Sequence, residues 1–252
     1  MRVPTTEVVA CARVSVVDGR LTWASAPPVV LRRTGPRQVH VVAVGGGPLG
    51  GDRLRLVVEV GPGERLTVHT AAATVVQPGR EAGAEAAFAV DLRVADGGEL
   101  VWRPEPTVVC DGAAWSSSVR VDLAGSARAR VVEQVVLGRA GQRGGRCSSA
   151  LDVVVDGAPL LATTTVLDGA DPALTGIGGT GGARSVGTVL LVGDDPDGED
   201  AGAEDGVVWA RSPLAGPGSL LTAVGTVRGV GRALARDDER ALVGPASGAP
   251  DG

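Results

Sequence analysis

Phe88-Ala-Val-Asp-Leu-Arg-Val94, followed directly by Ala95-Asp96-Gly97, is the stretch that decides the fold class. Large apolar residues alternate there with small or charged ones, which is typical of a β-strand with one buried face. The same period of two recurs in three other runs: Leu54–Val60, Val119–Leu123 and Leu151–Val155. Asp-Gly dipeptides, which favour tight hairpin turns, stand at 18–19, 96–97, 111–112, 156–157, 168–169, 197–198 and 205–206. Short strands with turns between them predict a mainly β chain.

The composition excludes several classes of protein. Of the 252 residues 44% are hydrophobic, which is enough for a core, while 39 Gly and 16 Pro predict many turns. Four Trp, one Phe and no Tyr, with a net charge of −5 and no basic block, argue against nucleic acid as a partner. Three widely spaced cysteines, with neither a leader pattern nor a long apolar run, predict a cytoplasmic protein that does not enter a membrane.

Patterns along the chain predict one β domain over residues 1–242. A short helical part is expected from about Ser219 to Leu242, where apolar residues fall near helical spacing. Within the domain, residues 194–206 carry seven acids and no base, and we expect a solvated acidic loop. Residues 243–252 are expected to be a disordered tail.

Three local patterns resemble catalytic or binding motifs but lack the context that these motifs need. Gly176–Gly181 matches the dinucleotide fingerprint, yet a strand-like run follows it instead of a helix. Ser185 has no histidine after it, as a nucleophile elbow requires. His40 and His69 lack the short spacing of metal ligands. The residues therefore predict neither a catalytic site nor a stably bound cofactor.

Two acids fall on or near apolar strand faces. Extending the parity of Leu54 and Leu56 backwards places Asp52 on the apolar side, and either Glu133 or Gln134 must face inward. A buried carboxylate is costly unless it is paired, hydrogen-bonded or hydrated. Two interpretations stay open. In the first, the acid forms an ion pair with an arginine such as Arg139 or reaches solvent at a strand end. In the second, it faces a hydrated polar interior.

Four segments in order resemble the signatures of a known family: Val44-Gly-Gly46-Gly-Pro-Leu-Gly50-Gly51-Asp52, His69-Thr70-Ala-Ala-Ala-Thr74, Gly98-Glu-Leu-Val-Trp102-Arg-Pro104 and Glu133-Gln-Val-Val-Leu137-Gly138-Arg139. The chain resembles the urease accessory protein family UreD, also called UreH, as a divergent member. Val75 stands where the family usually has Lys, and Val101 where it has an acid.

The resemblance implies a right-handed β-helix-like body of many short strands with a small helical part near the C-terminus. It implies a chaperone rather than an enzyme, which binds apo-urease and UreF and, through UreF, the GTPase UreG. Nickel would be delivered to urease in a GTP-dependent way, and Ni²⁺ would pass in transit through a hydrated interior. Asp52 and Glu133 are then the candidates for transient nickel contact.

Two other functions compete with this hypothesis. One is a β-helix enzyme that uses carboxylates as general acid and base, against which the few aromatic residues argue. The other is a structural β-scaffold in another complex.

Overall fold

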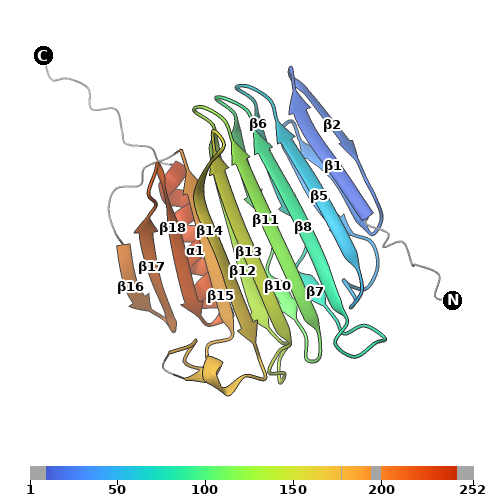
Figure 1. Cartoon of the computed structure of the whole chain (residues 1–252), viewed down its shortest axis with the longest axis vertical. Helices are drawn as coiled ribbons and strands as arrows, with labels where there is room; N and C mark the ends of the chain where they lie inside the picture. The colour runs from blue at the N-terminus through green and yellow to red at the C-terminus, as the bar shows by residue number, and fades with distance from the viewer. Residues whose placement is uncertain (1–9, 177, 194–199, 243–252) are drawn as a thin grey trace, which may run out of the picture.

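The protein is built from two facing β-sheets, and Figure 1 shows the strands running side by side across the front sheet. The computed structural model describes residues 10–176, 178–193 and 200–242. One α-helix, α1 (Val227–Leu242), lies within these ranges, together with the 3₁₀ turn Pro172–Thr175. The predicted mainly β fold with a small C-terminal helical part is confirmed.

The front sheet has seven strands, and its inner neighbours are all parallel. Antiparallel hairpin partners close its two edges. In spatial order the strands are β14 (Ala158–Asp168), β13 (Arg146–Val155), β11 (Ala114–Leu123), β8 (Glu85–Val94), β5 (Arg53–Val60), β1 (Ala10–Val17) and β2 (Arg20–Ala24).

The second sheet has eleven strands, which are parallel from β4 to β12 and antiparallel beyond. In order they are β16 (Asp200–Glu204), β17 (Val207–Pro213), β18 (Gly218–Gly225), β15 (Ser185–Val192), β12 (Arg128–Leu137), β9 (Glu99–Arg103), β6 (Arg65–Thr70), β4 (Gln38–Ala43) and β3 (Val29–Gly35). Two short strands, β7 (Thr74–Val76) and β10 (Thr107–Val109), pair beside this path.

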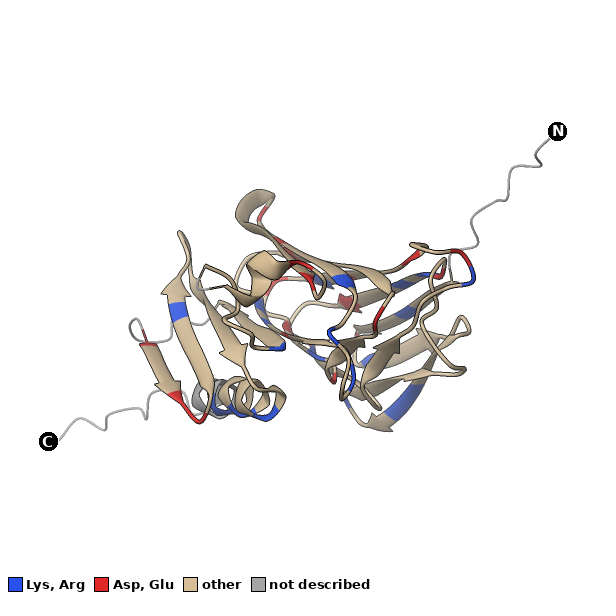
Figure 2. Ribbon diagram, turned by 90° about the horizontal axis from the view of Figure 1, so that it is seen from below, with Lys and Arg blue, Asp and Glu red and all other residues tan. Residues whose placement is uncertain are grey.

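The chain winds between the sheets as a β-solenoid of about four turns. From β4 to β13 it passes repeatedly from one sheet to the other, with β7 and β10 as additional short strands of the second sheet, so each circuit adds to both sheets. Figure 2, turned by 90°, shows the two layers facing each other. The β-helix-like body expected from the family resemblance is therefore present.

The alternating runs bury their apolar parity between the sheets, as their sequence predicts. Leu56 on β5, Leu92 on β8, Val121 on β11 and Val153 on β13 all belong to one core cluster. A second cluster lies between α1 and the outer side of β15 and β18, where Val230 and Leu234 of the helix are buried. Burial of this apolar surface is the main force that holds the layers together.

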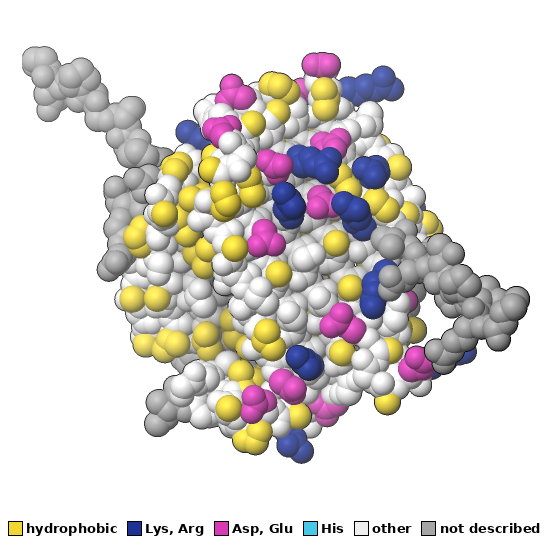
Figure 3. All heavy atoms as spheres, in the orientation of Figure 1, with side chains coloured by type: hydrophobic (Ala, Val, Ile, Leu, Met, Phe, Trp, Pro, Cys, Tyr) yellow, Lys and Arg dark blue, Asp and Glu magenta, His cyan; other side chains and the backbone are white. Residues whose placement is uncertain are grey.

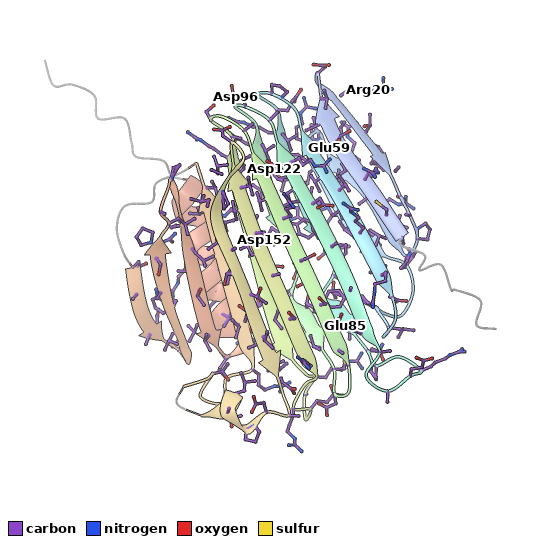
Figure 4. The ribbon with its side chains drawn as sticks, in the orientation of Figure 1. Arg20, Glu59, Glu85, Asp96, Asp122 and Asp152 are labelled. Carbon is purple, nitrogen blue, oxygen red and sulfur yellow. The ribbon has the colours of Figure 1, made fainter. Side chains whose placement is uncertain are left out.

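Charges of opposite sign follow one another across the outer face of the front sheet. Arg93 on β8 lies in register between Glu59 and Asp122 and pairs with Glu59 at 3.1 Å. Figure 3 shows basic and acidic side chains mixed on this face, and Figure 4 labels Glu59 and Asp122 there. Exposed pairs of this kind add little stability, but a slip in register would bring like charges together.

Of the six Asp-Gly dipeptides that the structure describes, three form the hairpin turns that the sequence predicts, while Asp197-Gly198 lies outside the described residues. Asp18, Asp156 and Asp205 have positive φ, and so do the glycines that follow them. They join β1 to β2, β13 to β14, and β16 to β17.

The hairpin prediction is wrong for Asp96-Gly97 and Asp111-Gly112. These dipeptides form corners at which the chain leaves one sheet for the other, and only their glycines have positive φ. At the first corner the Asp96 carboxylate accepts hydrogen bonds from Ser126 N and Oγ, at 2.8 and 2.9 Å, in the next coil. A turn dipeptide shows that the chain reverses direction but not which strand it then joins.

The predicted helix from Ser219 to Leu242 is wrong in its first part. Residues up to Gly225 form strand β18, and α1 begins at Val227. Thr226 caps the helix, because its Oγ1 accepts a hydrogen bond from Gly229 N at 3.0 Å. Leu221 and Ala223 are buried beneath the helix through the two-residue period of a strand.

The predicted acidic loop 194–206 is also wrong where the structure describes it. Asp200–Glu204 form β16, paired with β17, and Asp205-Gly206 form the turn between them. Glu204 and Asp205 form ion pairs with Arg236 and Arg232 of α1, at 2.6 and 3.0 Å. The acids thus have partners across the fold that their own segment lacks. Residues 194–199 and the predicted tail 243–252 lie outside the described residues.

Candidate functional site

Glu133 is an acid that points into the space between the two sheets. On β12 it has the same parity as Ala129 and Val131, which belong to the core between the sheets, and as Leu137. Gln134 points to the opposite side, where its Nε2 donates to Ser185 Oγ at 2.9 Å and to the Val227 carbonyl at 3.0 Å. Both polar residues are therefore accommodated: Glu133 inside the solenoid, and Gln134 beneath α1.

A cavity of about 40 Å³ adjoins Glu133 where the two sheets face each other. Its lining comes from both sheets and is mostly apolar with several hydroxyl groups: Glu133, Val135, Cys147, Ser149, Leu151, Thr163, Thr165, Leu167, Val186, Gly187, Thr188 and Leu220. A polar cavity needs roughly 10–15 Å³ per water molecule, so a few waters fit here. Arg139 is exposed and forms no ion pair with Glu133.

The surroundings of Glu133 favour its neutral form. Burial raises the pKa of Glu133 to about 7, and a 3.4 Å hydrogen bond from Ser149 Oγ lowers it only slightly. Burial also raises the pKa of the Cys147 thiol to about 12, with a smaller contribution from the Glu133 charge. Near neutral pH the carboxyl group can therefore take up or release a proton, while the thiol stays protonated.

The cavity can offer a passing cation oxygen ligands but no complete coordination sphere. Among the residues that the structure describes, no group of three or more His, Cys, Asp or Glu side chains could hold a metal ion. One carboxylate with Ser149 and threonine hydroxyls provides hard donors, which bind divalent cations more weakly than clustered imidazoles or thiolates do. The arrangement suits brief contact with a metal ion rather than storage.

Asp52 lies elsewhere, in the loop before β5. Its Oδ2 accepts a hydrogen bond from Leu49 N at 2.9 Å, and Ala87 N donates to its carbonyl at 2.8 Å. It lines a separate surface hollow with Pro78 and Gly79. The structure therefore does not bring Asp52 and Glu133 together, and it gives Asp52 a part in shaping the loop.

The first two family segments meet at a second, larger cavity of about 300 Å³. Gly46 of the glycine-rich loop and Thr70 to Thr74 line it together with Phe88 and Trp115. Gly50 lies so close to the next loop that an added Cβ would be 2.4 Å from the Ala84 carbonyl oxygen. These segments thus fix the shape of one end of the solenoid.

Other family residues also hold corners in place. Thr70 Oγ1 accepts from Glu105 N at 2.8 Å and donates to the Ala72 carbonyl at 3.1 Å, which ties the second segment to the chain just after Pro104. Trp102 is buried in the core. Thr74 lies in register with Thr107 at the start of the β7–β10 pair.

The segment Leu137-Gly138-Arg139 wraps around Arg184. The Arg184 guanidinium donates to the carbonyls of all three residues, at 2.6 to 2.9 Å. Gly138 has φ +67°, and an added Cβ would be 2.8 Å from Gly144 N. This family motif therefore forms a structural corner at the end of the strand that carries Glu133.

Cys147 and Ser149 were not identified as site residues from the sequence. The signal was present, because extending the inward parity of Leu151 and Val153 backwards along β13 reaches both of them. What the sequence did not show is that β13 faces Glu133 across the gap between the sheets.

No helix within the described ranges is both long enough and apolar enough to cross a bilayer.

The fold and the site define a class: a two-sheet β-solenoid with a single carboxyl group between the sheets, beside a small and mostly apolar cavity that carries hydroxyl groups. Comparison with known proteins identifies the family within this class. The model of the UreD urease accessory protein family matches residues 20–242, and the chain belongs to that family.

Individual relatives agree with this assignment. The urease accessory protein UreD of Frankia alni is 44% identical over 204 residues, which cover 74% of this chain and 67% of that protein. The UreD of Parafrankia sp. is 39% identical over 224 residues, covering 79% and 75%. The UreD of Streptomyces coelicolor is 38% identical over 205 residues, covering 78% and 80%.

Proposed function

We propose that the chain is a urease maturation chaperone that binds apo-urease and UreF and, through UreF, UreG. In this role it supports GTP-dependent delivery of nickel to the urease active site in the cytoplasm, without catalysing a reaction and without a resident cofactor. The observation that carries the proposal is the family match over residues 20–242. The relatives that are similar in sequence are named as urease accessory proteins.

We also propose that Ni²⁺ in transit contacts Glu133. The support is its position between the sheets, next to a cavity with hydroxyl groups. Attraction between a carboxylate and a divalent cation is much stronger in a protein interior than in bulk water. A carboxyl group with a pKa of about 7 can release its proton when a cation arrives and take one up after the cation leaves. Asp52, on the outer surface of the glycine-rich loop, stays a candidate for an earlier contact on the same path.

The test of the function is reconstitution of urease maturation. The urease subunits, UreF and UreG are expressed with and without this chain, and urease is purified for metal analysis. We expect nickel-loaded, active urease only when the chain is present, and we expect the chain to co-purify with apo-urease and UreF. Equal nickel loading without the chain would contradict the proposal.

A further inference from the structure

The only two histidines of the chain lie side by side on the outer face of the second sheet. His40 on β4 and His69 on β6 are direct partners in the parallel register of these strands. On both strands the neighbours Val39, Val41 and Val68 point into the core, so the histidines point outward. Both rings are half-buried among their neighbours on the sheet.

The two rings have the separation that a shared metal ion requires. Their centroids are 5.2 Å apart and their planes are tilted by 30°. Two imidazoles bound to one metal ion at about 2.1 Å, with about 90–110° between the ligands, have centroids about 4.5–5.3 Å apart. The observed separation of 5.2 Å lies within this range.

One ring is already held by a hydrogen bond of the kind that supports metal ligands. Thr34 Oγ1 lies 2.7 Å from His40 Nδ1. Histidines that bind metals usually use one ring nitrogen for the metal and the other for such a partner, which fixes the orientation of the ring. This contact engages Nδ1 and leaves Nε2 of His40 for a metal ion.

We propose that His40 and His69 form a binding site for a divalent metal ion that prefers imidazole, such as Ni²⁺, Cu²⁺ or Zn²⁺. The inference rests on this pair and not on the proposed role in urease maturation. Imidazole suits these ions, whereas Mg²⁺ and Ca²⁺ prefer oxygen ligands. Two protein ligands leave the other positions to water, so the bound ion would exchange readily.

Two arginines flank the pair and make the site sensitive to charge. Arg32 lies in register with His40, and Arg103 with His69, so the four basic residues form one row across β3, β4, β6 and β9. Their positive charge weakens the binding of a cation and strengthens the binding of an anion. Replacing Arg32 by a neutral residue should therefore raise the affinity of a metal site for its cation, whereas it should lower the affinity of an anion site for its anion.

The test is a calorimetric titration of the purified full chain with NiCl₂ and, separately, with inorganic phosphate. The chain is purified with an affinity tag that contains no histidine. We expect one equivalent of Ni²⁺ to bind, and His40→Ala or His69→Ala to weaken binding at least about tenfold. Arg32→Gln should tighten Ni²⁺ binding about two- to fivefold, because it removes a nearby positive charge. Cu²⁺ should bind more tightly than Ni²⁺, and its electron paramagnetic resonance spectrum should show coupling to two nitrogens.

The matched control changes the neighbouring pair on the same two strands and the same face. Gln38 and Thr67 are also partners in register, and the double variant Gln38→Ala, Thr67→Ala should bind Ni²⁺ as the parent does. If an alanine variant of either histidine fails to fold, glutamine at the same position replaces it. Unchanged Ni²⁺ binding in both histidine variants would overturn the proposal. So would phosphate binding that Arg32→Gln weakens, with no Ni²⁺ binding.

Discussion

The carboxyl group of Glu133 is largely removed from water and has few protein partners that replace the lost hydration. Its one hydrogen bond comes from Ser149 at 3.4 Å, and no ion pair reaches it within the described part of the chain. A group in this position costs stability when it is charged, and proteins commonly keep such groups for function. The proton on Glu133 therefore links the stability of the fold to the proposed handling of nickel.

Glu133→Gln should stabilise the protein at high pH. The pKa of Glu133 is about 7 in the folded state, against 4.5 as its ordinary value, so the wild type loses stability as the pH rises through this window. Glutamine has nearly the same shape and carries no charge. We expect the variant to gain about 2–3 kcal/mol in free energy of unfolding at pH 8 and almost nothing at pH 4.5. Urea denaturation at the two pH values measures this, and an equal effect at both would contradict the raised pKa.

Asp52 shows how parity along a strand can mislead beyond the end of the strand. The alternation of Leu54 and Leu56 assigned it to the apolar side, but β5 begins at Arg53 and Asp52 belongs to the preceding loop. Its side chain accepts a hydrogen bond from Leu49 N. We expect Asp52→Ala to cost about 1 kcal/mol of stability, measured by denaturant unfolding, because the hydrogen bond from Leu49 N within this loop is lost. An unchanged free energy of unfolding would show that the loop does not depend on this contact.

At the scale of elements, glycines decide how α1 lies on the sheet. An added Cβ at Gly187 on β15 would be 2.7 Å from both Leu234 Cδ1 and Val230 Cγ1. At Gly231 within α1 it would meet only Gln134 Oε1, at 3.6 Å. One glycine is thus required by packing, while the other is replaceable.

We therefore expect opposite effects from two similar substitutions. Gly187→Ala should lower the free energy of unfolding by about 1–3 kcal/mol, because it pushes the helix away from β15. Gly231→Ala should raise it by up to about 1 kcal/mol, because alanine favours the helix. Denaturant unfolding of both variants measures this. A stable Gly187→Ala protein would show that α1 is not packed as described.

The corner at Asp96 joins successive coils through side-chain bonds. The hydrogen bonds from Ser126 N and Oγ lower the pKa of Asp96, so this contact stabilises the fold above the ordinary pKa of an aspartate and is lost as the pH falls below it. Asp96→Ala should lower the melting temperature at pH 7, and the difference from the wild type should shrink toward pH 2.5. A difference that does not depend on pH would argue against a charged acceptor at this corner.

Individual strands and their buried faces were easier to predict from the sequence than the contacts between elements. The alternation in Phe88–Val94 or Val119–Leu123 is a local property, and these runs became β8 and β11 with the expected buried face. The start of α1 was missed because Leu221, Val224 and Val227 are spaced three apart, as in a helix, whereas the buried face of the strand is formed by Leu221 and Ala223. The Thr226 cap was the better signal. The position of β16 was missed because Glu204 at its end and Asp205 in the following turn have their partners on α1, more than 25 residues further along the chain.

At the scale of the whole molecule, the solenoid brings together residues that no spacing rule connects. Glu133 and Cys147 line one cavity because β12 and β13 belong to opposite sheets. His40 and His69 are neighbours because β4 and β6 belong to consecutive coils of the same sheet. Register and layer order come from the complete winding of the chain, so neither pair could be read from one sequence. The family motifs, by contrast, were recognisable because the corners of the chain require glycine at particular positions, such as Gly50 and Gly138.

We propose that Glu133 contacts nickel on its way to urease. The direct measurement is the initial rate of nickel loading into urease that is co-expressed with UreF, UreG and either the wild-type chain or Glu133→Gln. Glu59→Gln is the matched control, because it removes one carboxylate from the outer face of the front sheet. The urease–chaperone complex is recovered by pull-down in each case, so that failure to assemble is seen separately.

We expect Glu133→Gln to form the complex normally, since the variant is at least as stable as the wild type near neutral pH. Nickel loading should then slow about tenfold or more, because a loss of 1.4 kcal/mol of attraction for the cation changes a rate tenfold. Glu59→Gln should load nickel at the wild-type rate. Nickel loading by Glu133→Gln at the wild-type rate, within an intact complex, would contradict the account.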